Sequence, residues 1–311
     1  VGAGVVPFAL GTDTGGSVRV PAAFCGVYGF RTTPGHEWIR DAFPLSPTCD
    51  TAGWFTANPG DLRTVIDALL GKGISPRHET AGQALTWSRG ALAPVNDRNA
   101  ARAPHLQEVP GPSERTNENS LRGCFLTCAD LGVEPDADFA RAGTAMAARF
   151  APPADDATRD ALRAAWTDAV DTYATVVMHE AHAIHRDWLA PFRENYDPVI
   201  WQRISDGGRV PAEQLAQARE NLGSVRESWR QFFATHDFLV LPCAPFPALR
   251  KADCTPEARR ALLRLTAPAS LGGLPVLTVP VPLAGGLTGG LQIVAREAAS
   301  PVFDRVLREL E

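Results

Sequence analysis

A glycine-rich segment near the start of the chain constrains the fold more than any other feature. An apolar run at residues 5–10 reads as a buried strand, and the segment GTDTGGSVRVPAAFCG follows at residues 11–26. Glycine tolerates positive φ, so the backbone of such a turn can approach a ligand closely. Successive N–H groups in the turn converge on a site for negative charge. The segment therefore predicts a strand that ends in a tight, anion-accepting turn.

Ser17 stands at the end of this turn. A hydroxyl beside convergent N–H donors is the arrangement that acyl transfer uses, with a nucleophile and an oxyanion hole. Asp13 and Arg19 flank the turn and can pair with each other or cap it. A structural glycine turn with an N-capping serine would show the same residues, so this pattern by itself leaves both interpretations open.

Composition narrows the class of protein. A chain of 311 residues corresponds to two ordinary domains or one large one. The net charge of −5 and the dispersed Lys and Arg argue against a nucleic-acid partner, and the lack of any run of about 18 apolar residues argues against a membrane partner. Six scattered cysteines without metal or redox spacing indicate a reducing compartment. We therefore expect a cytoplasmic protein without a metal or a cofactor.

Helix and strand patterns alternate along the chain. Periodicity and composition predict helices at residues 61–70, 137–190, 211–235, 256–266 and 301–310. Short apolar runs predict strands at residues 125–128, 238–243, 274–280 and 289–295. Two segments carry no clear pattern, namely the turn-rich residues 31–60 and the residues 72–135, which are assigned only as a loop or an insertion. The alternation predicts an α/β fold.

Single positions exclude several other motifs. Lys72 and Lys251 are the only lysines, and neither has a serine three residues before it, which excludes a Ser-x-x-Lys hydrolase. Lys72 is followed by Gly73 rather than by Ser or Thr, which excludes a phosphate-binding loop. Arg19 stands where a nucleophile elbow requires its last glycine.

The segment HEAHAIH at residues 179–185 carries side chains that can bind metals. A zinc-binding helix of this type needs two histidines at i and i+4, whereas His179, His182 and His185 are three residues apart. The segment fits a partly exposed helix with three polar rings, a helix that lines a site, or a metal site. We favour the first interpretation.

Longer stretches around Ser17 resemble one family. Residues 11–22 match, at every position, the pattern Gly-[Ser/Thr]-Asp-x-Gly-Gly-Ser-x-Arg-x-Pro-[Ala/Ser] of the amidase signature family. Further landmarks of that family are similar to residues 24–35, 45–53, 266–275 and 290–293. The chain is identified on these motifs as a member of the family, and the resemblance is weakest over residues 72–175.

The resemblance implies a fold and a set of roles. The fold would consist of α/β/α layers around a mixed central sheet, as a single amidase domain over residues 1–311 that lacks its N-terminal part. The implied roles lie within the glycine-rich turn and are a nucleophile at Ser17, an oxyanion hole from the N–H groups of Thr14, Gly15, Gly16 and Ser17, and structural supports at Asp13 and Arg19.

The chain departs from the family at one point. The resemblance implies a Ser–Ser–Lys triad, in which the bridging serine and the lysine precede the nucleophile, but residues 1–16 contain neither a serine nor a lysine. We therefore expect the bridging serine and the catalytic lysine to be absent from this chain. Such a truncated chain would be inactive and poorly soluble on its own.

The activity implied by the resemblance is hydrolysis of a small carboxylic amide through a serine acyl-enzyme, in a protein that could form a homodimer. One alternative is the glutamine-amidase subunit of a tRNA amidotransferase, although that subtype tends to carry Gln where Val20 stands. A second alternative is a catalytically dead amidase-like interaction domain, although Ser17 is retained.

Overall fold

The computed structural model describes residues 1–70 and 121–311, and within them the strands form one mixed sheet. In spatial order its seven strands are β1 (Phe8–Asp13), β3 (Thr51–Thr56), β2 (Tyr28–Arg31), β6 (Val276–Pro282), β7 (Thr288–Ala295), β5 (Phe238–Pro242) and β4 (Gly123–Phe125). Neighbouring strands run antiparallel, except that β4 and β5 are parallel. Strands from the two ends of the chain meet in the middle of the sheet, where β2 pairs with β6.

Side-chain caps mark where several helices begin. The described α-helices are α1 (Arg19–Cys25), α2 (Pro59–Leu70), α3 (Ala137–Phe150), α4 (Asp156–Ala165), α5 (Ala169–Leu189), α6 (Pro198–Gly207), α7 (Ala212–Thr235), α8 (Pro256–Leu271) and α9 (Pro301–Leu310). Those with a capping side chain, which accepts a backbone N–H of the first turn, are α3, α4, α6, α8 and α9, capped by Asp136, Asp155, Asp197, Thr255 and Ser300.

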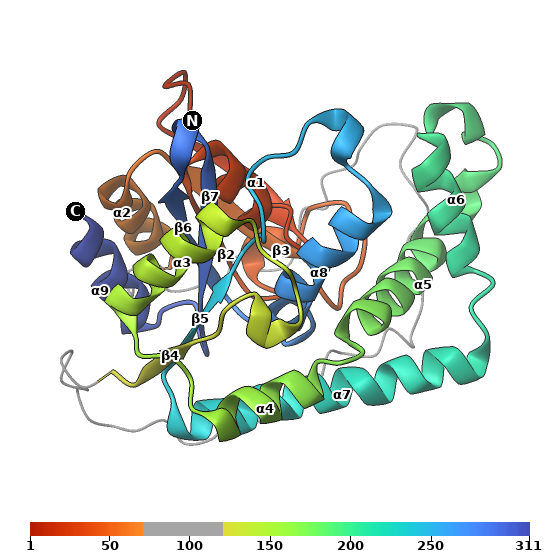
Figure 1. The fold of residues 1–311 in the computed structure, drawn as a ribbon. Coiled ribbons are helices and arrows are strands. Elements are labelled where there is room, and N and C mark those ends of the chain that lie inside the picture. The colour runs from red at the N-terminus through yellow and green to blue at the C-terminus, as the bar shows by residue number, and fades with distance from the viewer. Residues whose placement is uncertain (71–120) are drawn as a thin grey trace, which may run out of the picture.

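Helices cover both faces of the sheet (Figure 1). Successive residues of a strand point to opposite faces. On β7, a Cβ at Gly290 would lie 2.5 Å from Ala23 of α1, and a Cβ at Gly289 would lie 2.5 Å from Phe139 of α3. We call the α1 side the first face and the α3 side the second face. The layers are therefore helix, sheet and helix, as predicted.

The remaining helices of the sandwich follow the same division. On the first face α1 shares the layer with α8, and on the second face Phe303 of α9 packs edge-on against Phe30 of β2. Helix α2 packs against α9. The helices α5 and α6 stand to the side of the strands, with α8 between α5 and the sheet, and α4 and α7 run together along the lower edge of the view (Figure 1).

Several predicted strands are displaced in the structure. The strand predicted at residues 5–10 is β1, three residues later, because its pairing with β3 continues to Asp13 opposite Thr51. The prediction that this strand is buried is wrong, since β1 is an edge strand on which Phe8 and Leu10 are exposed. The turn-rich residues 31–60 contain β3, which the sequence interpretation missed, and the strand predicted at 125–128 is β4. Residues 71–120, which include most of the unassigned 72–135 stretch, lie outside the described residues.

Two helix predictions also need correction. Residues 137–190 form three helices rather than one stretch. The first break, between α3 and α4, contains Pro152 and Pro153, which cannot continue a helix. Helix α8 continues beyond residue 266 even though Pro268 offers no N–H. The carbonyl of Pro268 accepts a hydrogen bond from Trp229 of α7 at 2.9 Å, so side chains of a neighbouring helix stabilise this last turn.

Candidate active site

The glycine-rich turn connects β1 to α1 and needs its glycines for two different reasons. Gly16 has φ 127°, a backbone conformation that favours glycine. Gly15 has no room for a side chain, because a Cβ there would lie 2.2 Å from the hydroxyl oxygen of Tyr173 on α5. The turn therefore depends on a positive φ at one position and on a close approach at the position before it.

The Asp13 carboxylate holds the turn from the inside. Its Oδ1 accepts the Gly16 N–H at 2.8 Å, and its Oδ2 accepts the N–H groups of Val18 at 3.1 Å and Arg19 at 3.3 Å. Asp13 is fully buried. Charge-assisted hydrogen bonds to backbone N–H groups are stronger than neutral ones. Asp13 thus directs the backbone on both sides of Ser17.

Two buried arginines complete the cluster around Asp13. Arg19 donates to Asp13 from Nε at 3.1 Å and from Nη2 at 3.0 Å, and Arg31 of β2 donates from Nη1 at 2.8 Å. Arg19 also donates to Gln292 Oε1 on β7 at 2.7 Å and to Ser270 Oγ on α8 at 2.6 Å. The turn is therefore anchored to elements from the far end of the chain.

The cluster holds more buried positive than negative charge, since Arg19 and Arg31 both pair with Asp13. Burial by itself would raise the pKa of Asp13, but the positive charges of Arg19 and Arg31 and its hydrogen bonds outweigh burial and hold the pKa well below its usual value of 3.8. Burial lowers the pKa of Arg31 to about 10, against the attraction of Asp13. One buried carboxylate thus faces two buried guanidinium groups. Within the described residues, Nε and Nη2 of Arg31 have no hydrogen-bond partner.

The outer side of the turn carries unpaired polar groups. Ser17 is exposed, and within the described residues its hydroxyl forms no hydrogen bond. The backbone N–H groups of Thr14, Gly15 and Ser17 also have no acceptor in this part of the chain, whereas the Gly16 N–H is taken by Asp13. The turn therefore presents an exposed hydroxyl beside unpaired N–H donors.

Two later helices enclose Gly15. Thr266 of α8 donates its hydroxyl to the Gly15 carbonyl at 2.7 Å. Tyr173 of α5 is buried, which raises the pKa of its phenol, so the hydroxyl stays protonated beside Gly15. Within the described ranges this hydroxyl has no hydrogen-bond partner. Tyr173 is therefore a further polar group that faces the turn.

Comparison with known proteins gives the family. The family model described as Amidase matches residues 1–89 and 137–300, which is most of the chain and includes the whole turn. The chain belongs to the amidase family. The resemblance that the motifs carried is therefore confirmed.

The relatives that the chain resembles are longer than it is. Indoleacetamide hydrolase from Pseudomonas syringae pv. syringae is 30% identical over 96% of this chain and 62% of its own length. A subunit of the glutamyl-tRNA(Gln) amidotransferase from Exiguobacterium sibiricum is 28% identical over 100% of this chain and 65% of its own length. The crystal structure of an amidase superposes with a TM-score of 0.71 at 23% identity, over 98% of this chain and 63% of that one, which confirms the α/β fold. The chain thus spans less than two thirds of these proteins.

The histidine-rich stretch at residues 179–185 lies on α5 and packs against α6. His182 Nδ1 lies 3.1 Å from the Ile204 carbonyl oxygen, and His185 Nδ1 lies 2.8 Å from the Tyr196 hydroxyl. Burial lowers the pKa of His185. Across residues 1–70 and 121–311 the structure gathers no group of His, Cys, Asp and Glu that could hold a metal. The histidine rings are half-buried packing groups. Glu180, which lies between His179 and His182 in the sequence, instead accepts hydrogen bonds from Ser46 and Thr48, in the segment before β3.

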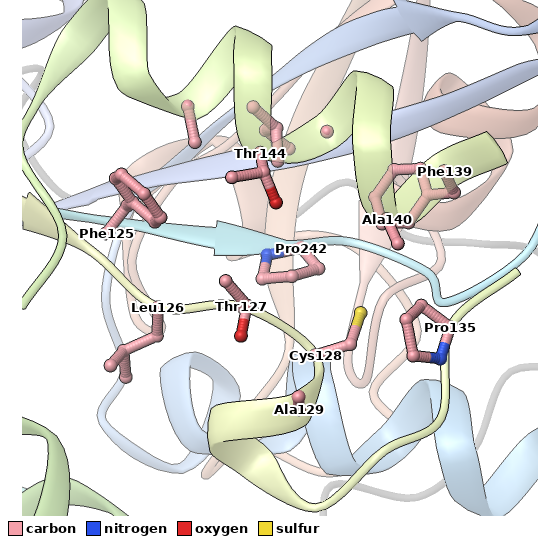
Figure 2. A pocket seen from close by; sticks show the side chains of 13 residues that line it. Phe125, Leu126, Thr127, Cys128, Ala129, Pro135, Phe139, Ala140, Thr144 and Pro242 are labelled. Atoms are coloured by element: carbon pink, nitrogen blue, oxygen red, sulfur yellow. The ribbon is translucent and has the colours of Figure 1, made fainter. Parts of the chain in front are cut away.

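An apolar hollow of about 220 Å³ lies away from the turn. Figure 2 shows side chains of α3 and of the segment around Cys128 facing each other across it. Leu291 of β7 lines the hollow, whereas its neighbour Gln292 binds Arg19. Because neighbouring strand residues point to opposite faces, the hollow is on the second face and the turn is on the first. The hollow is not part of the candidate site.

No hydrogen bond joins Ser17 to Lys251, the lysine that the structure describes. Lys251 is exposed in the short helix Lys251–Asp253, and Lys72 lies outside the described residues.

In the described part of the chain, no helix combines the length and the apolar character needed to cross a membrane.

Sequence reasoning missed three side chains that shape the site. Arg31 lies in a stretch that resembled the family, so its position could have been weighed as a second cation for Asp13. Gln292 also lies in such a stretch. Tyr173 lies in an alanine-rich helical region with no motif, so nothing local indicated its contact with Gly15.

Proposed function

We propose that the whole protein hydrolyses a small carboxylic amide, with Ser17 as the nucleophile that forms an acyl-enzyme. The observation that carries the proposal is the exposed Ser17 hydroxyl, unbonded within the described residues, beside the unpaired N–H groups of Thr14 and Gly15. Membership of the amidase family supports the reaction class.

The chemistry follows from the two sides of the turn. Ser17 Oγ would attack the amide carbonyl, and the carbonyl oxygen, as it becomes negative, would accept hydrogen bonds from unpaired N–H groups of the turn. The C–N bond then breaks, the amine or ammonia leaves with a proton, and water hydrolyses the ester to release the acid. Because the Gly16 N–H is held by Asp13, we assign the oxyanion contacts to Thr14, Gly15 and Ser17.

A base must take the Ser17 proton. Within the described residues no side chain accepts a hydrogen bond from this hydroxyl. The family resemblance assigns this task to a bridging serine and a neutral lysine, and residues 1–16 supply neither. We therefore propose that this chain carries the nucleophile and its support without the base, and that activity belongs to the whole protein.

The deciding experiment combines labelling with turnover. The whole protein is treated with a fluorophosphonate, which forms a bond with an activated serine, and is assayed for ammonia release from indoleacetamide, the amide named in one relative. We expect mass spectrometry to find the label on Ser17, and Ser17→Ala to abolish both labelling and turnover. An unlabelled Ser17 in a protein that still hydrolyses amides would contradict the nucleophile assignment, and loss of both activities in the wild type would favour an inert interaction domain.

A second candidate is supported by the 28% identity to a subunit of a glutamyl-tRNA(Gln) amidotransferase. In that case the substrate would be glutamine, and the released ammonia would be passed on rather than lost. Glutamine and indoleacetamide assayed side by side separate the two functions. Ammonia release from glutamine alone would favour the amidotransferase role.

A further inference from the structure

Glu180 of α5 binds the turn that precedes β3. Its Oε2 accepts the Ser46 hydroxyl at 2.5 Å and the Thr48 N–H at 3.2 Å, and its Oε1 accepts the Thr48 hydroxyl. Both carboxylate oxygens are therefore used by one short segment, residues 46–48. This segment is more than 130 residues away in the sequence.

Asp50 carries the connection on to the glycine-rich turn. Its Oδ2 accepts the N–H groups of Leu45 and Ser46, both at 2.8 Å, which closes the segment around the carboxylate. Its Oδ1 accepts the Thr14 hydroxyl at 2.6 Å. Ser46 thus contacts Glu180 through its hydroxyl and Asp50 through its N–H. A continuous set of hydrogen bonds runs from Glu180 through Ser46 and Asp50 to Thr14.

The same helix reaches the turn a second time. Tyr173 lies seven residues before Glu180, about 10 Å along the helix on the same side, and its hydroxyl lies against Gly15. Helix α5 also packs against α8, the helix that binds Gly15, and Asp171 near Tyr173 forms an exposed ion pair with Arg260 of α8 at 2.7 Å. Helix α5 therefore contacts Gly15 directly and Thr14 through the Glu180 connection.

We propose that Glu180 is a positioning residue of the acyl site, which holds Thr14 and its N–H in place through residues 46–50. This inference rests on the proposed function, since it concerns the N–H groups that would bind the oxyanion. The physical reason is that donors in an oxyanion hole act only when they are fixed in advance. Glu180 would thereby contribute to the reaction although it touches neither Ser17 nor a substrate.

A kinetic test separates positioning from general support of the fold. In the whole protein we expect Glu180→Gln to lower kcat about 10-fold and Glu180→Ala to lower it about 100-fold, with little change in KM. Neither fall should exceed the one that follows the removal of an oxyanion donor itself. Asp187→Asn removes an exposed carboxylate from the same helix and serves as the matched control without an effect. Equal falls in kcat for Glu180→Gln and Asp187→Asn, or a rise in KM alone, would overturn the inference.

A double variant tests the route through Thr14. Thr14→Val removes the hydroxyl that Asp50 accepts and keeps a similar shape. If Glu180 acts through this hydroxyl, the variant with both changes should lose no more kcat than the more affected single variant, because coupled residues are not additive. Multiplied effects would mean that Glu180 acts by another route, which overturns the proposal.

Hydrogen exchange provides a readout that does not need turnover. We expect Glu180→Gln to speed amide exchange in peptides that cover residues 12–18, at a temperature where the variant is folded, and Asp187→Asn to leave it unchanged. Unchanged exchange in that segment would overturn the inference whatever the activity. If Ser17 proves inert while the exchange responds to Glu180, the proposed function fails and the positioning of the turn stands.

Discussion

The two sides of the glycine-rich turn differ in how fully their polar groups are paired. On the inner side, Asp13 is surrounded by backbone N–H groups and by the guanidinium groups of Arg19 and Arg31, all buried. On the outer side, Ser17 is exposed and unbonded within the described residues. The difference indicates that the buried charges fix the backbone of the turn. The backbone N–H groups on the other side can therefore stay unpaired and in place for a substrate.

The outer side should control activity alone. In the whole protein we expect Ser17→Ala to lower amide turnover by about 10⁴-fold or more and to leave the melting temperature unchanged, because the hydroxyl has no hydrogen bond to lose within the described residues. Ammonia release and differential scanning fluorimetry measure the two quantities. A large fall in the melting temperature would break the comparison, since it would show that the outer side also supports the fold.

The inner side should control stability. Asp13→Asn would leave two guanidinium groups buried with weaker partners. Removing one partner of a buried ion pair costs about 3–5 kcal/mol, so we expect a fall in the free energy of unfolding of that order in urea titrations. A fall below about 1 kcal/mol would mean that Arg19 and Arg31 find other acceptors. Asp187→Asn, on an exposed surface of α5, is the control.

Acid should weaken the inner side of the turn, where Asp13 is the buried carboxylate. The folded-state pKa of Asp13 lies well below its usual value of 3.8, so its contribution to stability is fully present above about pH 4 and is lost as pH falls through the folded-state value. We expect the wild type to lose stability faster than Asp13→Asn between pH 4 and the acid limit of folding. Parallel pH profiles for the two proteins would contradict the charge-based origin of this support.

The close approach at Gly15 offers the smallest test. Gly15→Ala would place a Cβ 2.2 Å from the Tyr173 hydroxyl, and overpacking of this kind costs about 1–3 kcal/mol. Gly223→Ala on α7 is the control, since nothing lies within 4 Å of a Cβ there, and it should stabilise by about 0.5–1 kcal/mol. Thermal unfolding of both variants checks the prediction. Similar stabilities would show that α5 moves easily away from the turn.

Local patterns in the sequence predicted most helices and the α/β class. The stretches at 211–235 and 301–310 appear as α7 and α9 with almost the same bounds, since amphipathic periods of that length are strong signals. The short strand β3 was missed because residues 31–60 are dominated by turn residues, and its six residues become a strand only through pairing with β1 and β2. The Pro268 turn of α8 was missed because a hydrogen bond from α7 stabilises it.

The sequence by itself determined the glycine-rich turn, its serine and the residues that flank it, because residues 11–22 hold the whole motif in one local stretch. Only the tertiary structure decided that Asp13 faces two arginines, that Tyr173 lies against Gly15, and that Glu180 connects to Thr14 through Asp50. Most of these contacts join residues that lie far apart in the sequence. They depend on how α5, α8 and the strands pack together, and the pattern around one residue contains no information about such packing.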